Sequence, residues 1–305
     1  MEPKREQFDR PGEHGSLSAL VWDHAGDAAP LLIFLHANGF NANTYKRLLT
    51  PLADQMRIVA LDMRGHGFSD LAADPDRLRN WYIYRDDLNV LRDTLSRGQP
   101  TVLAGHSLGA ATAVLAAQSC PTGIVGLFLI EPVMAPGWAW RVASLMRRMG
   151  ISNRVARLSR AAAARRMTWP DAATMLNTYR GRRAFRTWPD ATIADYIKGG
   201  TRPSAGGGLE LTCHPNWEAA TFKAHSHNLW AKLPSLNCPV HIMAGSAHST
   251  FPPALADRVE KRLKDLTIQR IEQATHFLPM EQPERIQQEL RRFMSDVTDR
   301  ATATI

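Results

Sequence analysis

The chain has 305 residues, a formal net charge of +8, 44% hydrophobic residues and three cysteines. This composition suits a globular protein with one large domain, and the length leaves room for an insertion. No apolar run approaches the ~20 residues of a membrane helix, and the charged first residues do not lead into the apolar core of a secretory signal. The cysteines are scattered and odd in number, so we expect no disulfide framework and a reducing, cytoplasmic environment.

Apolar runs and helical patterns alternate along the first 133 residues. A continuous apolar run such as Leu31–Leu35, bounded by a proline and a polar loop, predicts a buried strand. Between such runs, leucines recur with helical spacing, as at Leu88, Leu91 and Leu95. This alternation favours a mostly parallel sheet with helices on both faces. Strands are predicted at residues 17–22, 31–35, 57–61, 100–104 and 124–130.

The pattern changes in the middle of the chain. Residues 134–236 contain no strand-like apolar run and are rich in Arg and Ala, with several Trp and Met. Alternation then returns, with strands predicted at 239–244 and 266–271 and a closing helix after them. We therefore predict a core domain of residues 1–133 and 237–305, into which residues 134–236 are inserted as a helical cap.

The pentapeptide from Gly105 to Gly109 has the pattern G-x-S-x-G, with Ser107 at its centre. A predicted strand precedes it, and an Ala-rich helical stretch follows. In this context the pattern is typical of a nucleophile elbow, a sharp turn that exposes a serine at the end of a sheet. Glycine is expected on both sides of the serine because a side chain there would collide with the neighbouring strand or helix. The sequence therefore predicts Ser107 as a nucleophile.

Four stretches, in this order, resemble the α/β-hydrolase superfamily. They are His36–Phe40, Asp62–Ser69, the elbow around Ser107, and Ala274–Glu284 near the C-terminus. The resemblance covers most of both core segments and leaves the middle segment unexplained, except as a cap of the kind that this family carries. It implies an α/β-hydrolase fold, with a mostly parallel central sheet, helices on both faces and an inserted helical cap.

The resemblance also implies roles for individual residues. A serine hydroxyl needs a base within hydrogen-bond reach, and His276 matches the family's catalytic histidine. The oxyanion hole needs two backbone N–H groups aimed at the developing negative charge. One is expected from Leu108, directly after Ser107, and the other from Asn38, in the loop after the second predicted strand.

The acid of the triad is where the sequence departs from the usual pattern. Many members of the superfamily carry an Asp shortly after the strand that here ends at Ala244, but His248 stands at that place. A histidine cannot orient and stabilise an imidazolium as a carboxylate does. Either the triad is broken, or the acid has moved to Glu131, directly after the strand next to the elbow strand. The alternative role for Glu131 is to cap a turn of the inserted segment or to bind an arginine.

These residues predict hydrolysis of a carboxylic ester with a small or medium apolar acyl group, through an acyl-enzyme. Lactone, thioester or carbon–carbon bond hydrolysis would use the same groups. A non-catalytic binder of a small molecule is the alternative from a different class. Phe40 and His106, which neighbour the predicted oxyanion donor and the nucleophile in sequence, are expected to contact the small-molecule substrate.

Much of the positive charge lies in the predicted cap, without any nucleic-acid-binding motif, so no nucleic-acid partner is expected. A basic amphipathic cap could contact a membrane surface or attract anionic substrates, and it could equally be a solvated helical face. His225 and His227 have no further ligands nearby in sequence, so neither a metal nor another cofactor is expected. The sequence leaves the oligomeric state open.

Overall fold

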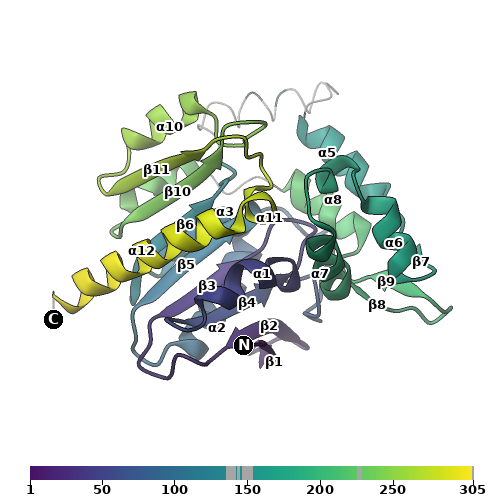
Figure 1. Ribbon diagram of the computed structural model, residues 1–305, viewed down its shortest axis with the longest axis horizontal. Coiled ribbons are helices and arrows are strands. Elements are labelled where there is room, and N and C mark those ends of the chain that lie inside the picture. The colour runs from purple at the N-terminus through teal and green to yellow at the C-terminus, as the bar shows by residue number, and fades with distance from the viewer. Residues whose placement is uncertain (135–141, 143–144, 146–153, 225–228, 304–305) are drawn as a thin grey trace.

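An eight-stranded sheet runs through the centre of the computed structural model, which describes residues 1–134, 142, 145, 154–224 and 229–303 (Figure 1). In this sheet β3 to β6, β10 and β11 run parallel, and β1 and β2 are antiparallel additions at one edge. The predicted fold class, a mostly parallel sheet, is confirmed. In spatial order the strands are β1 (Lys4–Asp9), β2 (Ser16–Trp22), β4 (Arg57–Asp62), β3 (Leu31–Leu35), β5 (Thr101–His106), β6 (Ile124–Ile130), β10 (Val240–Gly245) and β11 (Leu266–Ile271).

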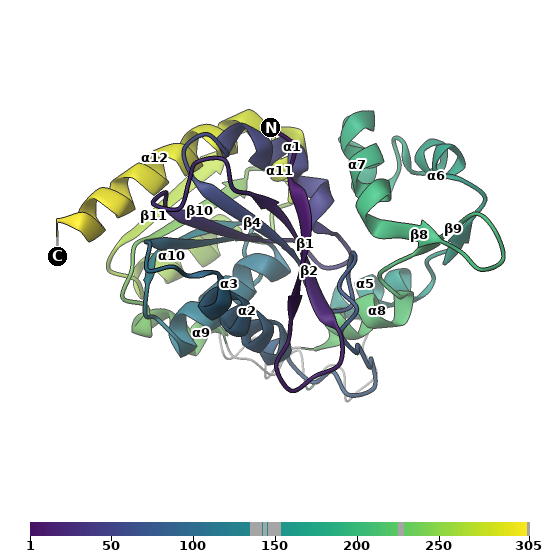
Figure 2. The same ribbon diagram turned by 90° about the horizontal axis from the view of Figure 1, so that it is seen from below.

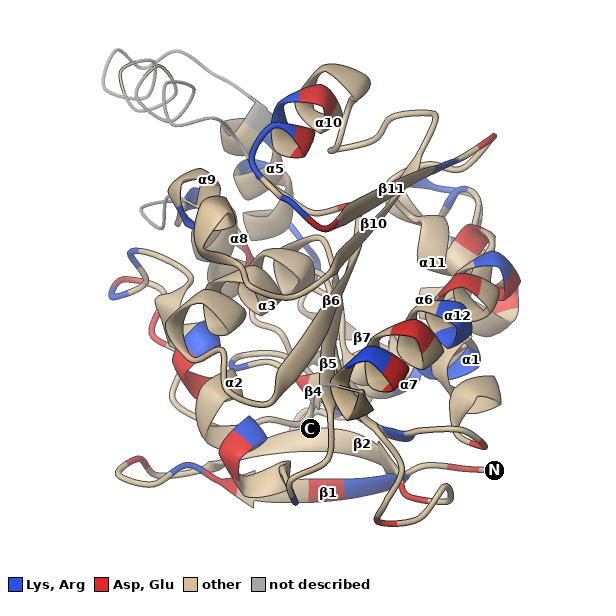
Figure 3. Ribbon diagram, turned by 90° about the vertical axis from the view of Figure 1, so that its left-hand side faces the viewer, with Lys and Arg blue, Asp and Glu red and all other residues tan. Residues whose placement is uncertain are grey.

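Apolar side chains on both faces explain why the central strands are continuous hydrophobic runs. Along β3, Leu31, Ile33 and Leu35 join the core on one side of the sheet, and Leu32 and Phe34 join the core on the other. This follows from the alternation of side chains along a strand. Figure 3 shows charged residues on surface helices, on loops and on the edge strand β1, whereas the central strands β5 and β6 carry none.

Helices cover both faces of the sheet (Figure 2). One face is covered by α2 (Tyr82–Leu95), α3 (Leu108–Ser119) and α10 (Pro253–Glu260). The other is covered by η1 (Ala42–Tyr45), α1 (Lys46–Leu49), η2 (Thr50–Leu52), α11 (Leu278–Glu281) and α12 (Pro283–Thr302). None of the helices within the described part of the chain is long and apolar enough to cross a bilayer.

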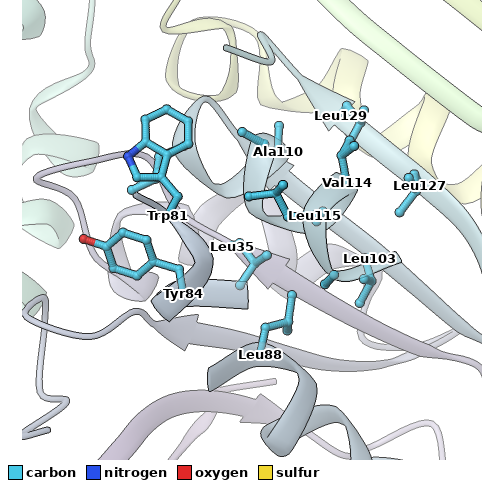
Figure 4. Packing of buried hydrophobic residues seen from close by; sticks show 14 of the residues in the cluster. Leu35, Trp81, Tyr84, Leu88, Leu103, Ala110, Val114, Leu115, Leu127 and Leu129 are labelled. Atoms are coloured by element: carbon cyan, nitrogen blue, oxygen red, sulfur yellow. The ribbon is translucent and has the colours of Figure 1, made fainter. Parts of the chain in front are cut away.

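The helix α3 is buried on nearly all sides. Its residues Ala110, Val114 and Leu115 pack between the sheet and α2, where they meet Leu88 and Leu35 (Figure 4). Each fully buried leucine or valine stabilises the fold by about 1.5–3 kcal/mol. The elbow that precedes α3 is therefore carried by one of the most firmly held elements of the core.

The residues 134–236 between β6 and β10, called the cap segment below, add no strand to the central sheet within the described residues. The described residues of the segment are mainly helical, and they also form a small antiparallel sheet in the order β7-β9-β8 that the sequence pattern did not indicate. Strands of two or three residues are too short to give a periodic signal. The elements are α5 (Arg154–Ala163), β7 (Thr168–Trp169), α6 (Ala172–Tyr179), η3 (Arg183–Phe185), α7 (Asp190–Gly200), β8 (Thr201–Pro203), β9 (Leu209–Leu211), α8 (Pro215–Lys223), α9 (Leu229–Lys232) and η4 (Leu233–Ser235).

The end of the cap segment packs with the core. Leu229, Trp230 and Leu233 of α9 and η4 belong to the same hydrophobic cluster as α3. The remaining elements lie beyond the carboxyl ends of the parallel strands (Figure 1). The division into a core domain and a separate cap remains a prediction from the sequence.

Candidate active site

The elbow at Ser107 has the strained geometry that its glycines suggested. Ser107 follows β5, N-caps α3 and has φ 56° and ψ −109°, a conformation that costs about 1–3 kcal/mol for a residue with a side chain. A Cβ on Gly109 would lie 2.1 Å from the carbonyl oxygen of Leu35, and one on Gly105 would lie 2.4 Å from the carbonyl carbon of Gly109. Both glycines are needed because backbone atoms occupy the space of a side chain.

Backbone hydrogen bonds bring the ends of three strands together at this elbow. The Ser107 N–H donates to the carbonyl of Ile130 at the end of β6, at 2.9 Å. The next residue, Glu131, donates its N–H to the carbonyl of Met243 in β10, at 2.8 Å. Glu131 therefore lies one strand away from Ser107, at the same edge of the sheet, as its position in the sequence predicted.

The carboxylate of Glu131 is fully buried and accepts hydrogen bonds from the loop that follows β10. Its donors are the N–H of Gly245, the hydroxyl of Ser249 and the N–H of Thr250, each at 2.7 Å, and the hydroxyl of Thr250 at 3.0 Å. In that loop His248 is exposed and has a φ of 51°. The family pattern places the acid in this loop. In this chain the loop instead supplies hydrogen-bond donors to Glu131, which follows the neighbouring strand β6.

His276 completes this arrangement. Its Nδ1 lies 3.1 Å from Oε2 of Glu131 and 3.1 Å from the hydroxyl of Thr250. Because Nδ1 faces a carboxylate, it carries the proton, and Nε2 is left as the basic nitrogen. The sequence-predicted pair of Glu131 and His276 is thus in direct contact, and the His276 side chain keeps 18% of its surface exposed.

The charge of Glu131 is stabilised in spite of its burial. Burial alone would raise the pKa of this carboxyl, but the hydrogen bond and electrostatic attraction of His276, together with the bonds from Ser249 and Thr250, lower it to about 2. Glu131 is therefore ionised at neutral pH.

His106 needs a correction. It was expected to contact the substrate, but it is fully buried, and both ring nitrogens are engaged. Nδ1 lies 2.7 Å from the hydroxyl of Tyr45, and Nε2 lies 2.8 Å from the backbone carbonyl of His276. Burial lowers the pKa of His106 to about 3, so the ring is neutral. We therefore assign His106 to the support of the loop that carries His276, and not to contact with the substrate.

The loop of residues 36–40, called the oxyanion loop below, follows β3. The Gly39 N–H donates to Nε2 of His66 at 3.1 Å, and the Ala37 N–H donates to the hydroxyl of Tyr45 at 3.1 Å. Within the described residues the Asn38 N–H has no acceptor, and Leu108 begins α3, where N–H groups lack intrahelical partners. The two predicted oxyanion donors are therefore both available.

Phe40 belongs to a cluster of aromatic rings between the oxyanion loop and the cap segment. Its ring stacks on that of Phe277, the residue after His276, at 6.3 Å between centroids. It also meets Trp188 edge-on at 5.3 Å and Tyr196 at 5.7 Å, both from the cap segment. Phe40 and Phe277 are only partly buried, so this cluster presents an apolar surface next to His276.

Several residues of the site were missed from the sequence. Ser249 and Thr250 stood in the loop that was searched for an acid, where short hydroxyl side chains could have suggested donors to a carboxylate elsewhere. Arg165, Tyr196 and Glu218 of the cap segment contact the oxyanion loop or one another, and no spacing in the sequence links them.

The structure offers no metal ligand set: among the described residues, no group of three or more His, Cys, Asp or Glu could hold an ion. His225 and His227, which the sequence brought up, lie outside the described residues.

Comparison with known proteins agrees with this architecture. The sequence model of the "Alpha/beta hydrolase family" matches residues 32–289. A stretch of 104 residues, 34% of this chain, is 36% identical to 2-(acetamidomethylene)succinate hydrolase of Mesorhizobium japonicum, and it spans only 36% of that protein. The pimeloyl-[acyl-carrier protein] methyl ester esterase of Methylococcus capsulatus is 24% identical over 273 residues, 87% of this chain and 95% of that one.

Solved structures give the same picture of the fold. The crystal structure of E-2-(acetamidomethylene)succinate hydrolase aligns with a TM-score of 0.77 at 23% identity, covering 96% of this chain and 99% of the other. An esterase of Mycobacterium tuberculosis aligns with a TM-score of 0.75 at 21% identity, covering 97% and 93%.

Proposed function

The chain belongs to the alpha/beta hydrolase family and is a hydrolase, and from that premise we propose that it cleaves a carboxylic ester through an acyl-enzyme on Ser107. The observation that carries this proposal is the hydrogen bond between the buried Glu131 carboxylate and Nδ1 of His276, at the strand ends beside the elbow. His106, the residue before Ser107, lies 2.8 Å from the backbone carbonyl of His276, which brings the loop of the histidine to the elbow. A serine in a strained elbow and an acid-paired histidine on an adjoining loop are the parts used for nucleophilic attack.

In the proposed reaction, the hydroxyl oxygen of Ser107 attacks the ester carbonyl carbon while Nε2 of His276 takes the hydroxyl proton. The carbonyl oxygen becomes an oxyanion, held by the N–H groups of Asn38 and Leu108. The tetrahedral intermediate expels the alcohol, which receives the proton from His276. A water molecule then attacks the acyl-enzyme with the same base and acid steps, and releases the carboxylic acid and free Ser107. Glu131 orients His276 and stabilises its charged form.

The aromatic cluster supports an apolar acyl or alcohol group of small or medium size. The partly buried ring of Phe277 meets His276 edge-on and stacks on that of Phe40, and rings commonly line the apolar part of a ligand site. The relatives named above act, by their names, on a methyl ester and on a substituted succinate. Ester cleavage is therefore the reaction to test first, and the acyl group is to be found by a panel.

The test is hydrolysis of 4-nitrophenyl esters of increasing acyl length by the wild type and by Ser107→Ala. We expect the Ser107→Ala variant to lose at least about 10³-fold in kcat/KM, because the nucleophile is gone. The matched control is Ser295→Ala, an exposed serine on α12 whose hydroxyl bonds to Asp299 of the same helix; it should hydrolyse the esters as the wild type does. Hydrolysis that survives in Ser107→Ala would refute the proposed nucleophile.

A further inference from the structure

The cap segment holds the oxyanion loop through three direct contacts. The backbone carbonyl of Glu218 in α8 accepts a hydrogen bond from Nδ2 of Asn38 at 3.0 Å. The hydroxyl of Tyr196 in α7 donates to the carbonyl of Gly39 at 3.3 Å. The Glu218 carboxylate lies against the Cα of Gly39, since a Cβ there would be 2.6 Å from Cδ of Glu218. Gly39, with a φ of 76°, is thus a glycine for a second reason, the close approach of the cap segment.

Arg165, just after α5, ties these contacts together. Its Nη1 bonds to Oε2 of Glu218, and its Nη2 donates to the hydroxyl of Tyr196 at 2.5 Å. The Arg165 and Glu218 side chains are only 19% and 11% exposed. Removing one partner of a pair this deeply buried leaves the other charge uncompensated. Arg165, Tyr196 and Glu218, called the cap bridge below, therefore act as one unit.

The core holds the same loop from the opposite side. His66 accepts from the Gly39 N–H, and the hydroxyl of Tyr45 accepts from the Ala37 N–H. Nε2 of His66 also lies 3.3 Å from Oδ1 of Asn38, but this nitrogen already accepts from the Gly39 N–H, since Nδ1 faces the carbonyl of Arg64. Among the described residues, the hydrogen bonds of Asn38 Nδ2 and of the Gly39 carbonyl go to the cap segment. The Asn38 side chain and the Gly39 carbonyl lie on either side of the Asn38–Gly39 peptide, directly after the Asn38 N–H. Their hydrogen bonds to the cap segment restrain this peptide.

We propose that the cap bridge positions the oxyanion loop, so that the rate of the chemical step depends on contacts from the cap segment. The inference rests on the proposed function, in which the Asn38 N–H stabilises the oxyanion. The residues of the bridge are positioning residues, since they act through Asn38 and Gly39. An oxyanion forms only on the way to the transition state, so a misplaced donor lowers kcat and leaves KM nearly unchanged.

The experiment compares Arg165→Gln, Glu218→Gln and Tyr196→Phe with the wild type on the best 4-nitrophenyl ester and on its thionoester. We expect kcat on the ester to fall about ten- to a hundred-fold in the first two variants, with KM within about two-fold of the wild type. Tyr196→Phe removes one hydroxyl only and should lose about three- to ten-fold. Because sulfur is a weak hydrogen-bond acceptor, the thionoester gains less from the hole, and the ratio of ester to thionoester rates should fall in all three variants.

Arg180→Gln is the matched control, because Arg180 pairs with Asp190 in the same segment but is about half exposed. It should leave kcat, KM and the rate ratio unchanged. The double variant Arg165→Gln/Glu218→Gln should lose less than the product of the single losses, as expected for one unit.

Wild-type kcat in the folded variants, a rise in KM alone, or an unchanged rate ratio would each overturn the inference. Should the two charge variants fail to fold, as judged by circular dichroism, Tyr196→Phe decides alone. A failure of the proposed function looks different, because hydrolysis would then persist in Ser107→Ala. Were the wild type to hydrolyse no ester in the panel, the rate of Ser107 labelling by a fluorophosphonate, which also develops an oxyanion charge, serves as the readout for the same variants.

Discussion

Two buried glutamates, Glu131 and Glu218, each pair with a basic side chain, but they draw their partners from different parts of the chain. Glu131 receives its hydrogen bonds from the loop after the adjacent strand β10 and from His276. Glu218 meets Arg165 across the cap segment, between elements that no shared sheet brings together. The Glu131 carboxylate is held by residues at the edge of the central sheet, whereas the Glu218 carboxylate is held by the packing of cap-segment elements against one another.

The difference shows what a parallel sheet contributes to a reaction. Neighbouring parallel strands end at the same edge of the sheet. The residues that follow β5, β6 and β10 therefore lie close together, however the surrounding helices pack. The described residues of the cap segment add no strand to this sheet. Their contacts with the oxyanion loop depend on how α5, α7 and α8 pack. We therefore expect the chemistry at the sheet edge to be nearly all-or-none, and the contribution of the cap segment to be graded.

The largest effect expected from this comparison is on the reaction rate. Glu131→Gln should lower kcat by about 10³- to 10⁴-fold, because the amide no longer stabilises the charged form of His276. Glu218→Gln makes the same chemical change at Glu218 and should cost about a hundred-fold at most. Steady-state kinetics on one ester at pH 7 checks both. Equal losses of kcat in the two variants would contradict the expected difference between a carboxylate held at the sheet edge and one held by the packing of the cap segment.

Two glycines test the same contrast through stability. Gly109→Ala puts a methyl group against the Leu35 backbone, which cannot move aside, and should cost about 3 kcal/mol or more of unfolding free energy. Gly39→Ala meets the end of the Glu218 side chain, which can turn away, so we expect the smaller cost of about 1–2 kcal/mol for its positive φ. Urea denaturation measures both. A greater cost at Gly39 would mean that the cap segment is held as rigidly as the core.

The smallest effect concerns acid. The pKa of Glu131 in the folded protein, about 2, lies below its ordinary value of 4.5, so its ionised form stabilises the fold above about pH 4.5. This stabilisation is lost as the pH falls from about 4.5 towards 2, by about 1.4 kcal/mol per pH unit. The stability difference between the wild type and Glu131→Gln should therefore shrink by about 1.4 kcal/mol between pH 6 and pH 3.5 in urea titrations. A difference that stays constant with pH would mean that the folded protein does not favour ionised Glu131.

The sequence predicted the sheet well because its strands are long apolar runs with clear borders, as in Leu31–Leu35. It also predicted that Glu131 would lie beside the elbow, since strands that are consecutive in the chain commonly lie side by side, as β5 and β6 do. The donors Ser249 and Thr250 were missed because a hydroxyl side chain in a loop gives no signal of its direction. The cap bridge and the short strands β7 to β9 could not be predicted, because their contacts arise only once separate helices and turns have packed.

The packing of α9 and η4 against α3 has a practical consequence for chimeric proteins. These two elements form the end of the cap segment in sequence but share a hydrophobic cluster with the helix that starts at the elbow. A graft that replaced the whole stretch up to β10 would strip three apolar side chains from that helix. Exchanging cap segments between relatives therefore calls for a junction before Leu229, so that the recipient keeps its own α9 and η4 and the support beneath its nucleophile.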